Sequence, residues 1–333
     1  MKTIRWGMIG CGDVTELKSG PALQKANNSQ LVAVMCRTRE KARDYAARHG
    51  VPKWFDEGES LIRDPEVDIV YVATPPSSHM EYTLMAAKAG KPVYVEKPMA
   101  RTFQECQTMI DACKRAGVPI FVAYYRRSLP RFLKVKEILD SGGIGQIRSV
   151  AVTLHRPLPP EGYDSQNLPW RVNPEIAGAG QFLDLASHTL DYLDYILGPI
   201  VKATGNATNH AGLYPAEDIV AGSFIFQSGV HGTGLWCFTA FAPEDVTEIV
   251  GSKGKISFST FDTTPVVLTA SESVQQFSID NPIHIQQPLI QAIVDELNGV
   301  GRCPSTGQTA ARTSRVMDCM LESWRDSHKE ECG

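Results

Sequence analysis

Several features that direct proteins to specialised environments are missing from this 333-residue sequence. No apolar run approaches the roughly 20 residues that a membrane span needs, so we expect no membrane association. The formal net charge is −4, which argues against a dedicated nucleic-acid-binding protein, because such proteins usually carry a basic excess. The first residues lack the apolar stretch and cleavage site of a signal peptide, and we therefore expect a cytoplasmic protein.

The eight cysteines form neither a C-x-x-C pair nor a metal-ligand spacing. We therefore expect no disulfide framework and no metal site, as is usual for proteins of a reducing compartment. Cys11 follows the first predicted strand and Cys36 ends the second, and small buried residues are the simplest interpretation of both.

The first 125 residues alternate short apolar strands with helices. Strands of this kind, each followed by a helix, predict a parallel sheet that is covered on both faces. The expected strands are Ile4–Ile9, Leu31–Cys36, Trp54-Phe55, Asp68–Ala73, Pro92–Val95 and Pro119–Ala123. The helices expected between them are Val14–Lys25 (interrupted at Pro21), Lys41–His49, His79–Ala89 and Phe103–Ala116, with a turn at Leu61-Ile62.

After Leu129 the strands become longer and alternate apolar with polar residues, which predicts a mostly antiparallel sheet. The expected strands are Ile147–His155, Asp218–Phe226, Val230–Phe241, Thr247–Val250, Ile256–Ser259 and Val266–Ala270. The expected helices are Arg131–Asp140, Gly180–Leu197, His284–Asn298 and Gln308–Asp326.

These patterns predict an α/β chain of two domains. Residues 1–125 would form a doubly wound parallel domain of the Rossmann type, and residues 126–333 an α+β domain with a large, mostly antiparallel open sheet. Since an apolar sheet face left exposed usually means a partner, we expect a homodimer or a dimer of dimers through the second sheet.

A glycine-rich loop follows the first strand and opens a helix. Gly10 would make the tight turn and Gly12 would bring bare backbone close to a pyrophosphate at the helix N-terminus. Asp13 and Val14 belong to this loop, and we expect Asp13 to cap the helix rather than to bind phosphate. Thr15 stands where the full fingerprint has a third small residue. The loop predicts a dinucleotide site.

The end of the second strand bears on which dinucleotide binds. An NAD site would offer an acid to the ribose hydroxyls, but here Cys36, Arg37 and Thr38 precede the first acid, Glu40. An arginine at this place can stack on adenine and pair with a 2′-phosphate. We therefore favour NADP, with NAD as the alternative; solvated arginines at a helix start are the structural alternative.

Two further groups suggest chemistry. Lys97 stands just after the apolar strand Pro92–Val95, at the edge where parallel sheets bind ligands. Asp184, His188 and Asp191 stand at i, i+4 and i+7, so one helix face carries all three. A small-residue turn, residues 177–180, precedes that helix and permits close approach of a ligand or backbone.

With these motifs the chain resembles the Gfo/Idh/MocA family of nicotinamide-dependent oxidoreductases, nearly end to end. The matching motifs are Gly10-x-Gly12, Ala73-Thr74-Pro75-Pro76 with His79, Glu96-Lys97-Pro98, Trp170-Arg171, Asp184-x-x-x-His188 and Gly251-Ser252-Lys253-Gly254. The departures are Thr15 in the phosphate loop and Ala179-Gly180 in place of a purer glycine run.

The resemblance implies that Lys97, Asp184 and His188 act on the substrate carbon that faces the nicotinamide. Hydride transfer needs a group that exchanges the hydroxyl proton, and we favour His188 over Lys97 for this role. Lys97 would stabilise alkoxide-like charge and Asp184 would orient one of the two. Whether Lys97 or His188 is the acid/base stays open.

The resemblance also implies roles in cofactor and substrate binding. The cofactor residues expected on this basis are Thr74, Pro75, His79, Glu96, Lys97, Trp170 and Arg171. Substrate candidates, for each of which a structural role is the stronger interpretation, are Tyr124, Tyr125, Arg126, Arg127, His155, Arg156 and Asp191.

The function that the resemblance implies is hydride transfer between NADP (or NAD) and a sugar, anhydro-ketose or related polyhydroxylated substrate, with a pattern like that of 1,5-anhydrofructose reductases. Dihydrodiol or xylose dehydrogenase-like activity is the alternative within the family. A non-catalytic dinucleotide-binding sensor or co-regulator is the alternative outside enzymology, and the presence of Lys97 and His188 favours the enzyme.

Overall fold

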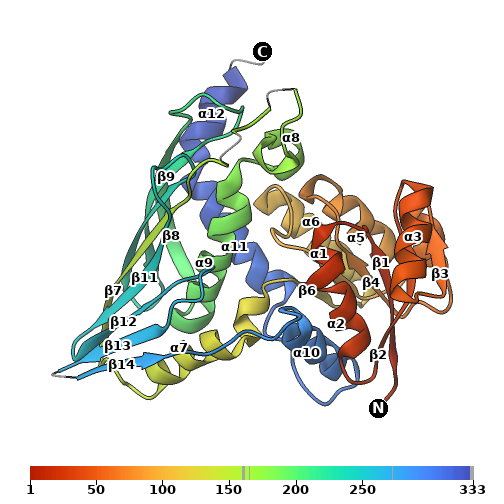
Figure 1. Ribbon diagram of the computed structural model, residues 1–333, viewed down its shortest axis with the longest axis horizontal. Coiled ribbons are helices and arrows are strands. Elements are labelled where there is room, and N and C mark those ends of the chain that lie inside the picture. The colour runs from red at the N-terminus through yellow and green to blue at the C-terminus, as the bar shows by residue number, and fades with distance from the viewer. Residues whose placement is uncertain (160–161, 165, 272, 331–333) are drawn as a thin grey trace. The chain divides into compact units, whose positions relative to one another are not determined.

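The computed structural model describes residues 1–159, 162–164, 166–271 and 273–330, so Cys332 lies outside the described residues. The chain forms two compact units (Figure 1). The first unit contains Met1–Leu129 and Asn281–Ala311, and the second contains Pro130–Asp280 and Arg312–Gly333.

The first unit is built on a six-stranded sheet in the order β3-β2-β1-β4-β5-β6. All neighbouring strands are parallel, which confirms the predicted doubly wound sheet. The strands are β1 Ile4–Ile9, β2 Ser29–Met35, β3 Lys53–Phe55, β4 Ile69–Val72, β5 Val93–Val95 and β6 Ile120–Val122. Every residue of β4, β5 and β6 is buried, as a sheet covered on both faces requires.

Helices connect these strands or, in the case of α10, join the unit from later in the chain. They are α1 Asp13–Leu17, α2 Gly20–Lys25, α3 Arg39–His49, α4 Gly58–Arg63, α5 His79–Lys88, α6 Phe103–Ala116 and α10 Gln287–Leu297, with 3-10 turns η1 Pro76–Ser78 and η2 Tyr125–Ser128. Thr102 caps α6, because its side chain accepts a hydrogen bond from the Glu105 N–H. The predicted interruption at Pro21 lies earlier in the structure, between α1 and α2, because proline is tolerated in the first turn of a helix.

The second unit contains an eight-stranded sheet in the order β14-β13-β12-β11-β7-β10-β9-β8. The strands are β7 Ile147–His155, β8 Ile200–Thr208, β9 Ile219–Phe226, β10 His231–Cys237, β11 Glu244–Gly251, β12 Gly254–Phe258, β13 Val266–Ala270 and β14 Ser273–Phe277. The pair β7–β10 is parallel and the other pairs are antiparallel, which confirms the predicted mostly antiparallel sheet.

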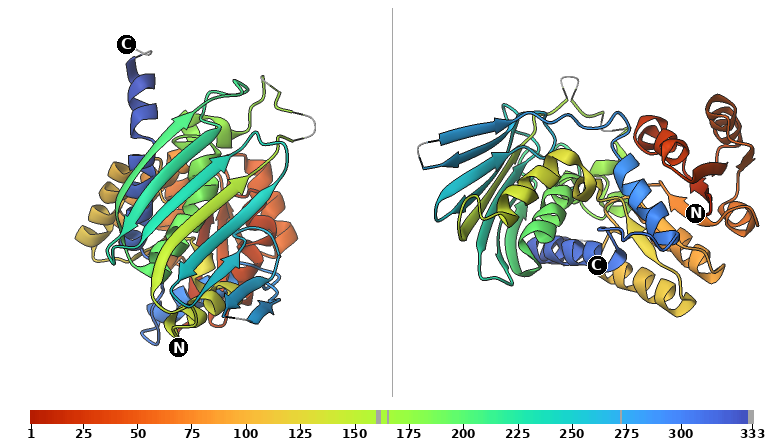
Figure 2. Two further views of the ribbon diagram at one scale, coloured as in Figure 1. Left: turned by 90° about the vertical axis from the view of Figure 1, so that its left-hand side faces the viewer. Right: turned by 90° about the horizontal axis from the view of Figure 1, so that it is seen from below.

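Helices cover one face of this sheet, and the other face is open among the described residues (Figure 2, left). The helices of the unit are α7 Pro130–Asp140, α8 Pro174–Ala177, α9 Gln181–Leu197, part of α11 Gly307–Met320, and α12 Glu322–Glu330, with the 3-10 turn η3 Trp170–Val172. Packing is aromatic: Phe182 of α9 meets the Trp236 ring edge-on at 5.1 Å between centroids. The single helix expected over Gln308–Asp326 is two helices, since α11 ends at Met320.

Strands β8 and β14 are absent from the predictions. The helix-covered positions of β8 are Ala203, Gly205 and Ala207, so its sequence shows no apolar alternation. Small residues are needed there, because a Cβ on Gly205 would lie 2.9 Å from the Met320 backbone oxygen. β14 is an edge strand with exposed polar residues.

Residues 281–311 pack with the first unit, whereas the sequence predicts a second domain that runs unbroken from 126 to 333. Helix α10 packs on α2 and η2. Gln286, which is fully buried, accepts a hydrogen bond from Tyr94 Oη at 2.7 Å and donates one to Glu96 Oε1 at 2.7 Å. The segment 281–311 is not a strand and has no sequence motif that links it to the first unit. The sequence therefore does not show that the chain returns to that unit.

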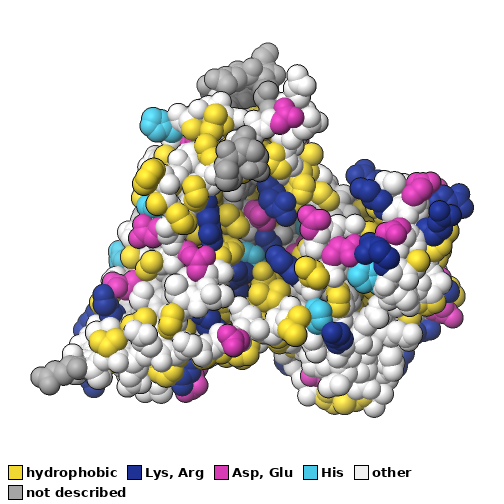
Figure 3. All heavy atoms as spheres, in the orientation of Figure 1, with side chains coloured by type: hydrophobic (Ala, Val, Ile, Leu, Met, Phe, Trp, Pro, Cys, Tyr) yellow, Lys and Arg dark blue, Asp and Glu magenta, His cyan; other side chains and the backbone are white. Residues whose placement is uncertain are grey.

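No helix among the described residues has both the length and the apolar character needed to cross a membrane. Acidic and basic side chains are interspersed over the visible surface (Figure 3).

Candidate active site

The phosphate loop begins where β1 ends. Gly10 has φ +108°, and a Cβ there would lie 2.6 Å from the Ala73 backbone oxygen, so this position requires glycine. Gly12 differs, because it is exposed, has φ −105°, and a Cβ added to it would meet no atom within 4 Å. The bare backbone of Gly12 thus faces open space at the start of α1, which fits the pyrophosphate of a dinucleotide.

Two details of this loop differ from expectation. Asp13 is the first residue of α1, the N-cap is Gly12, and no side chain caps the helix, so Asp13 does not have the predicted capping role. Thr15 is fully buried; its hydroxyl donates to the Gly12 carbonyl at 2.7 Å, and its own carbonyl accepts from Tyr45 Oη. Thr15 therefore restrains the turn through a side-chain hydrogen bond that a glycine at this position could not make.

The Cys11 side chain lies behind the loop, against the Met35 carbonyl at 3.7 Å. Burial raises the pKa of the Cys11 thiol to about 12, so it is neutral and unreactive at ordinary pH. Cys36 is half-buried. The burial of the Cys11 thiol supports the interpretation of Cys11 as a packing residue.

The residues after β2 are exposed. Arg37 and Thr38 stand before the first turn of α3, and the Thr38 side chain does not cap that helix. Arg39 lies over the Trp54 ring, with its guanidinium carbon 5.3 Å from the centroid. Arg39 thus has an intramolecular aromatic partner, whereas Arg37 is an exposed arginine between β2 and α3.

The turn after β4 is tied to the segment that follows Lys97. The His79 ring is fully buried, with Nε2 2.7 Å from the Thr74 carbonyl and Nδ1 3.1 Å from the Pro98 carbonyl. Burial lowers the pKa of His79, against the opposing effect of the neighbouring carbonyl groups. Thr74 and Pro75 are half-buried, and His79 contacts the Thr74 carbonyl.

A buried network holds the carboxylate before Lys97. Glu96 Oε1 accepts hydrogen bonds from Tyr71 Oη at 2.6 Å and from Gln286 Nε2 at 2.7 Å, and the Tyr71 and Tyr94 rings stack at 4.8 Å. Glu96 is 6% exposed, so its side chain supports the strand end from within the unit. Lys97 follows, half-buried, with a cis peptide bond to Pro98.

The candidates after β6 form the 3-10 turn η2 and its cap. Tyr124, Tyr125 and Arg126 are buried, and the Arg126 guanidinium lies 5.2 Å from the Tyr125 ring centroid. Arg127 donates to the Pro304 carbonyl at 3.0 Å, within the same unit. This packing agrees with the structural interpretation of these four residues.

In the second unit, α9 presents Asp184 and His188 on one face, one turn apart. Arg171 Nε donates to Asp184 Oδ2 at 3.1 Å, and the same guanidinium stacks on the Trp170 ring at 4.5 Å. The structure thus brings the adjacent residues Trp170 and Arg171 to Asp184, which lies 13 residues after Arg171 in the sequence. Because Arg171 is exposed, this ion pair restrains the orientation of Asp184 more than it adds stability.

His188 is 3% exposed and meets the Phe261 ring edge-on at 5.7 Å. Phe261 belongs to a turn between β12 and β13 that the sequence gives no reason to single out. The buried Asp245 accepts backbone N–H groups from Thr260, Phe261 and Asp262 at 3.0, 2.6 and 3.1 Å. Arg156 lies over Phe261 at 5.4 Å. A rigid turn therefore places an aromatic wall beside His188.

Two substrate candidates lie apart from this group. His155 Nδ1 is 3.2 Å from Glu244 Oε2, its partner across β7–β11, and it alternates with the buried Leu154, which puts it on the open face of the sheet. His155 therefore does not join Asp184 and His188. Asp191 is buried against Thr313, whose hydroxyl lies 3.4 Å from Oδ1, so packing accounts for it.

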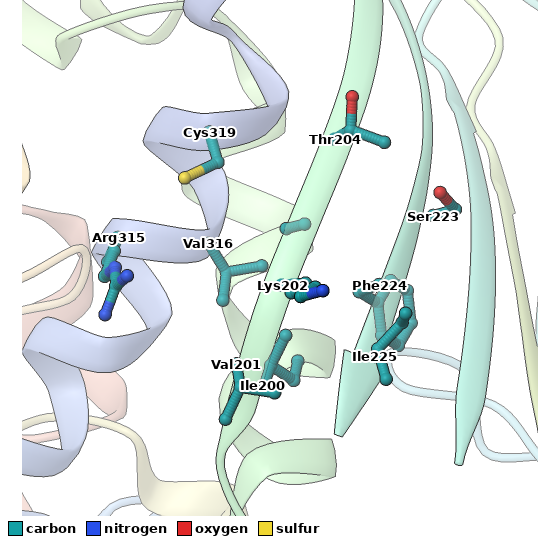
Figure 4. A pocket seen from close by; sticks show the side chains of 11 residues that line it. Ile200, Val201, Lys202, Thr204, Ser223, Phe224, Ile225, Arg315, Val316 and Cys319 are labelled. Atoms are coloured by element: carbon teal, nitrogen blue, oxygen red, sulfur yellow. The ribbon is translucent and has the colours of Figure 1, made fainter. Parts of the chain in front are cut away.

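A cavity of about 440 Å³ lies in the second unit between β8, β9 and α11 (Figure 4). It is lined mainly by apolar side chains such as Ile200, Phe224 and Val316. Its two cationic side chains, Lys202 and Arg315, do not point toward each other. None of its lining residues belongs to the predicted site.

Comparison with known proteins decides the family. A model described as "Oxidoreductase family, NAD-binding Rossmann fold" matches residues 4–124, and the GFO/IDH/MocA C-terminal domain matches residues 132–257. The chain belongs to the GFO/IDH/MocA family. The predicted resemblance is confirmed, and the protein is an oxidoreductase of the class that binds a nicotinamide dinucleotide.

Two curated relatives illustrate the likeness. Oxidoreductase P35 of Formosa agariphila is 38% identical over 315 residues, which cover 95% of this chain and 97% of that protein. The 1,5-anhydro-D-fructose reductase of Ensifer adhaerens is 30% identical over 310 residues, 91% of each chain. The fold is that of an aldose-aldose oxidoreductase from Caulobacter crescentus, solved with glycerol, with a TM-score of 0.84 at 24% identity over 98% of each chain.

Proposed function

We propose that this family member transfers a hydride between a nicotinamide cofactor and a CH–OH group of a sugar, an anhydro-ketose or a related polyhydroxylated compound. The relative that reduces 1,5-anhydro-D-fructose supports this substrate class. The observation that carries the proposal is the geometry of α9, where Asp184, restrained by Arg171, stands one turn before His188. That arrangement supplies a proton-exchanging imidazole beside an oriented carboxylate.

When bound, the cofactor supplies or accepts the hydride at its nicotinamide ring. We assign proton exchange at the substrate hydroxyl oxygen to His188, because an imidazole titrates near neutral pH. Lys97 Nζ donates a hydrogen bond to the same oxygen and stabilises its developing negative charge. Asp184 orients these groups, and the Phe261 ring beside His188 excludes water.

We propose that NADP(H) is preferred to NAD(H). After β2 the chain offers the exposed Arg37 and Thr38, with no acid before Glu40 to bind the ribose 2′-hydroxyl. A guanidinium pairs with a phosphate through two hydrogen bonds, which a hydroxyl does not reproduce. The preference therefore rests on Arg37.

The test is a fluorescence titration with NADPH and NADH, followed by a turnover screen of keto-sugars, sugar alcohols and aromatic diols with the tighter cofactor. We expect His188→Ala to keep the NADPH affinity and to lower kcat at least about a hundredfold, as loss of a general acid/base does. Lys97→Ala should also lower kcat, while Lys88→Ala, at an exposed lysine of α5, should not. Unchanged turnover in both active-site variants would refute the catalytic assignment, and NADPH binding without turnover on any compound would favour the sensor.

We also propose that the open sheet face forms a homodimer or a dimer of dimers. Leu235, Thr153 and Val246 lie in one row across β10, β7 and β11, and the two apolar side chains are 41% and 37% exposed. Light scattering after size exclusion should give at least twice the chain mass, and Leu235→Glu should reduce it. A wild-type protein that stays a monomer in this measurement would refute the proposed dimer.

A further inference from the structure

A buried carboxylate outside the proposed catalytic group sits at the N-terminus of α9. Glu217 is fully buried, and the Gly180 N–H, at the N-cap of α9, donates to both of its carboxylate oxygens at 2.8 Å. The segment that supplies Glu217 lies directly before β9, 37 residues further along the chain. The helix that carries Asp184 and His188 is therefore anchored by one side chain from another element.

The fit between Glu217 and Gly180 leaves no room for a side chain. A Cβ on Gly180 would lie 2.7 Å from the Glu217 backbone oxygen and 2.9 Å from Glu217 Oε1. Gly180 has φ −91°, which any residue adopts, so close approach and not backbone conformation accounts for the glycine.

The charged groups around Glu217 are few. Arg325 of α12 interacts electrostatically with it, while its guanidinium donates to the Gly178 carbonyl at 3.3 Å and pairs with Asp318 at 2.6 Å. Tyr214 contributes a neutral phenol from the preceding loop. The neighbouring Asp218 is directed elsewhere, since its two oxygens accept the N–H groups of residues 210 and 211.

We propose that Glu217 is a positioning residue that fixes the N-terminus of α9 and so sets where Asp184 and His188 stand. A helix leaves its first N–H groups without intrahelical partners, and an acceptor that satisfies one of them defines the helix start. Asp184 is four residues after Gly180 and His188 eight, so both move with the first two turns. The kinetic part of this inference rests on the proposed function; the anchoring itself does not.

The protonation of Glu217 makes the stability of the α9 N-terminus depend on pH. Burial raises the pKa of Glu217 to about 7, against the opposing effects of backbone N–H groups, including those of Gly180 and Phe182, and of Arg325. Since the closed structure holds the proton more tightly than an opened one, opening of the α9 N-terminus becomes easier as the pH rises through 7.

The kinetic experiment compares two changes at one position. Glu217→Leu removes the acceptor, and we expect kcat to fall roughly ten- to a hundredfold while NADPH affinity is unchanged, because a small displacement of catalytic groups is costly. Glu217→Gln retains an acceptor oxygen and should restore kcat to within about threefold of wild type. Glu137→Gln, at an exposed glutamate of α7, is the matched control. Wild-type kcat in Glu217→Leu would overturn the proposal.

The second experiment needs no turnover. Hydrogen exchange of the amides of residues 180–184, corrected for the intrinsic rate, should show protection that falls between pH 5.5 and 8 in the wild type and stays level in Glu217→Gln. The C-terminal turns of α9 should show no such change. A Gly180 amide that exchanges as fast as an exposed amide in the wild type refutes the anchor even if Glu217→Leu fails to fold, and a level pH profile refutes the raised pKa of Glu217. An inactive wild type with the expected exchange profile would instead refute only the proposed function.

Discussion

The two glycines of the phosphate loop provide a sharp test, because the structure gives them different reasons to be glycine. Gly10→Ala would place a methyl group 2.6 Å from a backbone oxygen at φ +108°. The backbone conformation costs about 1–3 kcal/mol and the forced contact about as much again. At about 2–4 °C per kcal/mol for a unit of this size, the midpoint of thermal unfolding should fall by at least about 4 °C.

Gly12→Ala should leave the fold intact. Its φ of −105° suits alanine and the new methyl group meets no atom within 4 Å, so stability should stay level or rise by about 0.5 kcal/mol. The methyl group would instead occupy the open space in front of the loop. If a pyrophosphate binds there, the Kd for NADPH should rise at least about tenfold, or about 1.4 kcal/mol.

The assay pairs thermal unfolding with NADPH fluorescence titration for both variants. Gly50→Ala, also in the left-handed region (φ 64°) but without a neighbour within 4 Å, separates the conformational cost from the contact cost and should lose only about 1–2 kcal/mol. Wild-type NADPH affinity in Gly12→Ala would show that this loop does not hold the pyrophosphate. A Gly10→Ala protein no less stable than Gly50→Ala would refute the contact argument.

Three further predictions concern the other groups. Arg37→Asp should raise the Kd for NADPH at least tenfold and change that for NADH less than about threefold; equal changes in the two titrations would show that Arg37 does not read the 2′-phosphate. Asp245→Ala leaves three backbone N–H groups without their acceptor and should destabilise the protein by about 2–4 kcal/mol in urea unfolding, with a lower kcat through Phe261, whereas Asp245→Asn should cost less than half as much. Burial raises the pKa of Glu217 to about 7 from 4.5, so its contribution to stability is most favourable below pH 4.5 and is lost as the pH rises through 7. Glu217→Gln should therefore gain on the wild type by up to about 3 kcal/mol between pH 4.5 and 8, and an unchanged difference would contradict the shift.

The features predicted correctly depend on short stretches of sequence. The strands of the first sheet are apolar runs, and the i, i+4 spacing of Asp184 and His188 needs only helical periodicity. The glycine loop is likewise local, although its pattern does not distinguish the two roles. Gly10 is required by the fold and Gly12 is open to a ligand, and that difference appears only when the neighbours are known.

The features that the sequence does not reveal depend on contacts between distant residues. Phe261 stands in a turn without a motif, and it matters because Asp245 holds that turn beside His188. In the sequence Glu217 is an ordinary acidic residue before a strand. Its role appears only in the structure, where its carboxyl group accepts the Gly180 N–H. Strand β8 lacks apolar alternation because Met320 packs where larger side chains would stand. In each case the role of the residue depends on a contact with a residue that is distant in the sequence, and the sequence pattern does not show that contact.

The return of residues 281–311 has a consequence for how the protein is made. Gln286, the buried partner of Tyr94 and Glu96, leaves the ribosome about 190 residues after the strand that it supports. Until then the Tyr94 hydroxyl lacks its acceptor and Glu96 lacks one of its two donors at Oε1, while the whole eight-stranded sheet emerges. The unit that begins first is thus completed late, and a fragment that stops at Leu129 would retain the phosphate loop and Lys97 but lose the support beneath them.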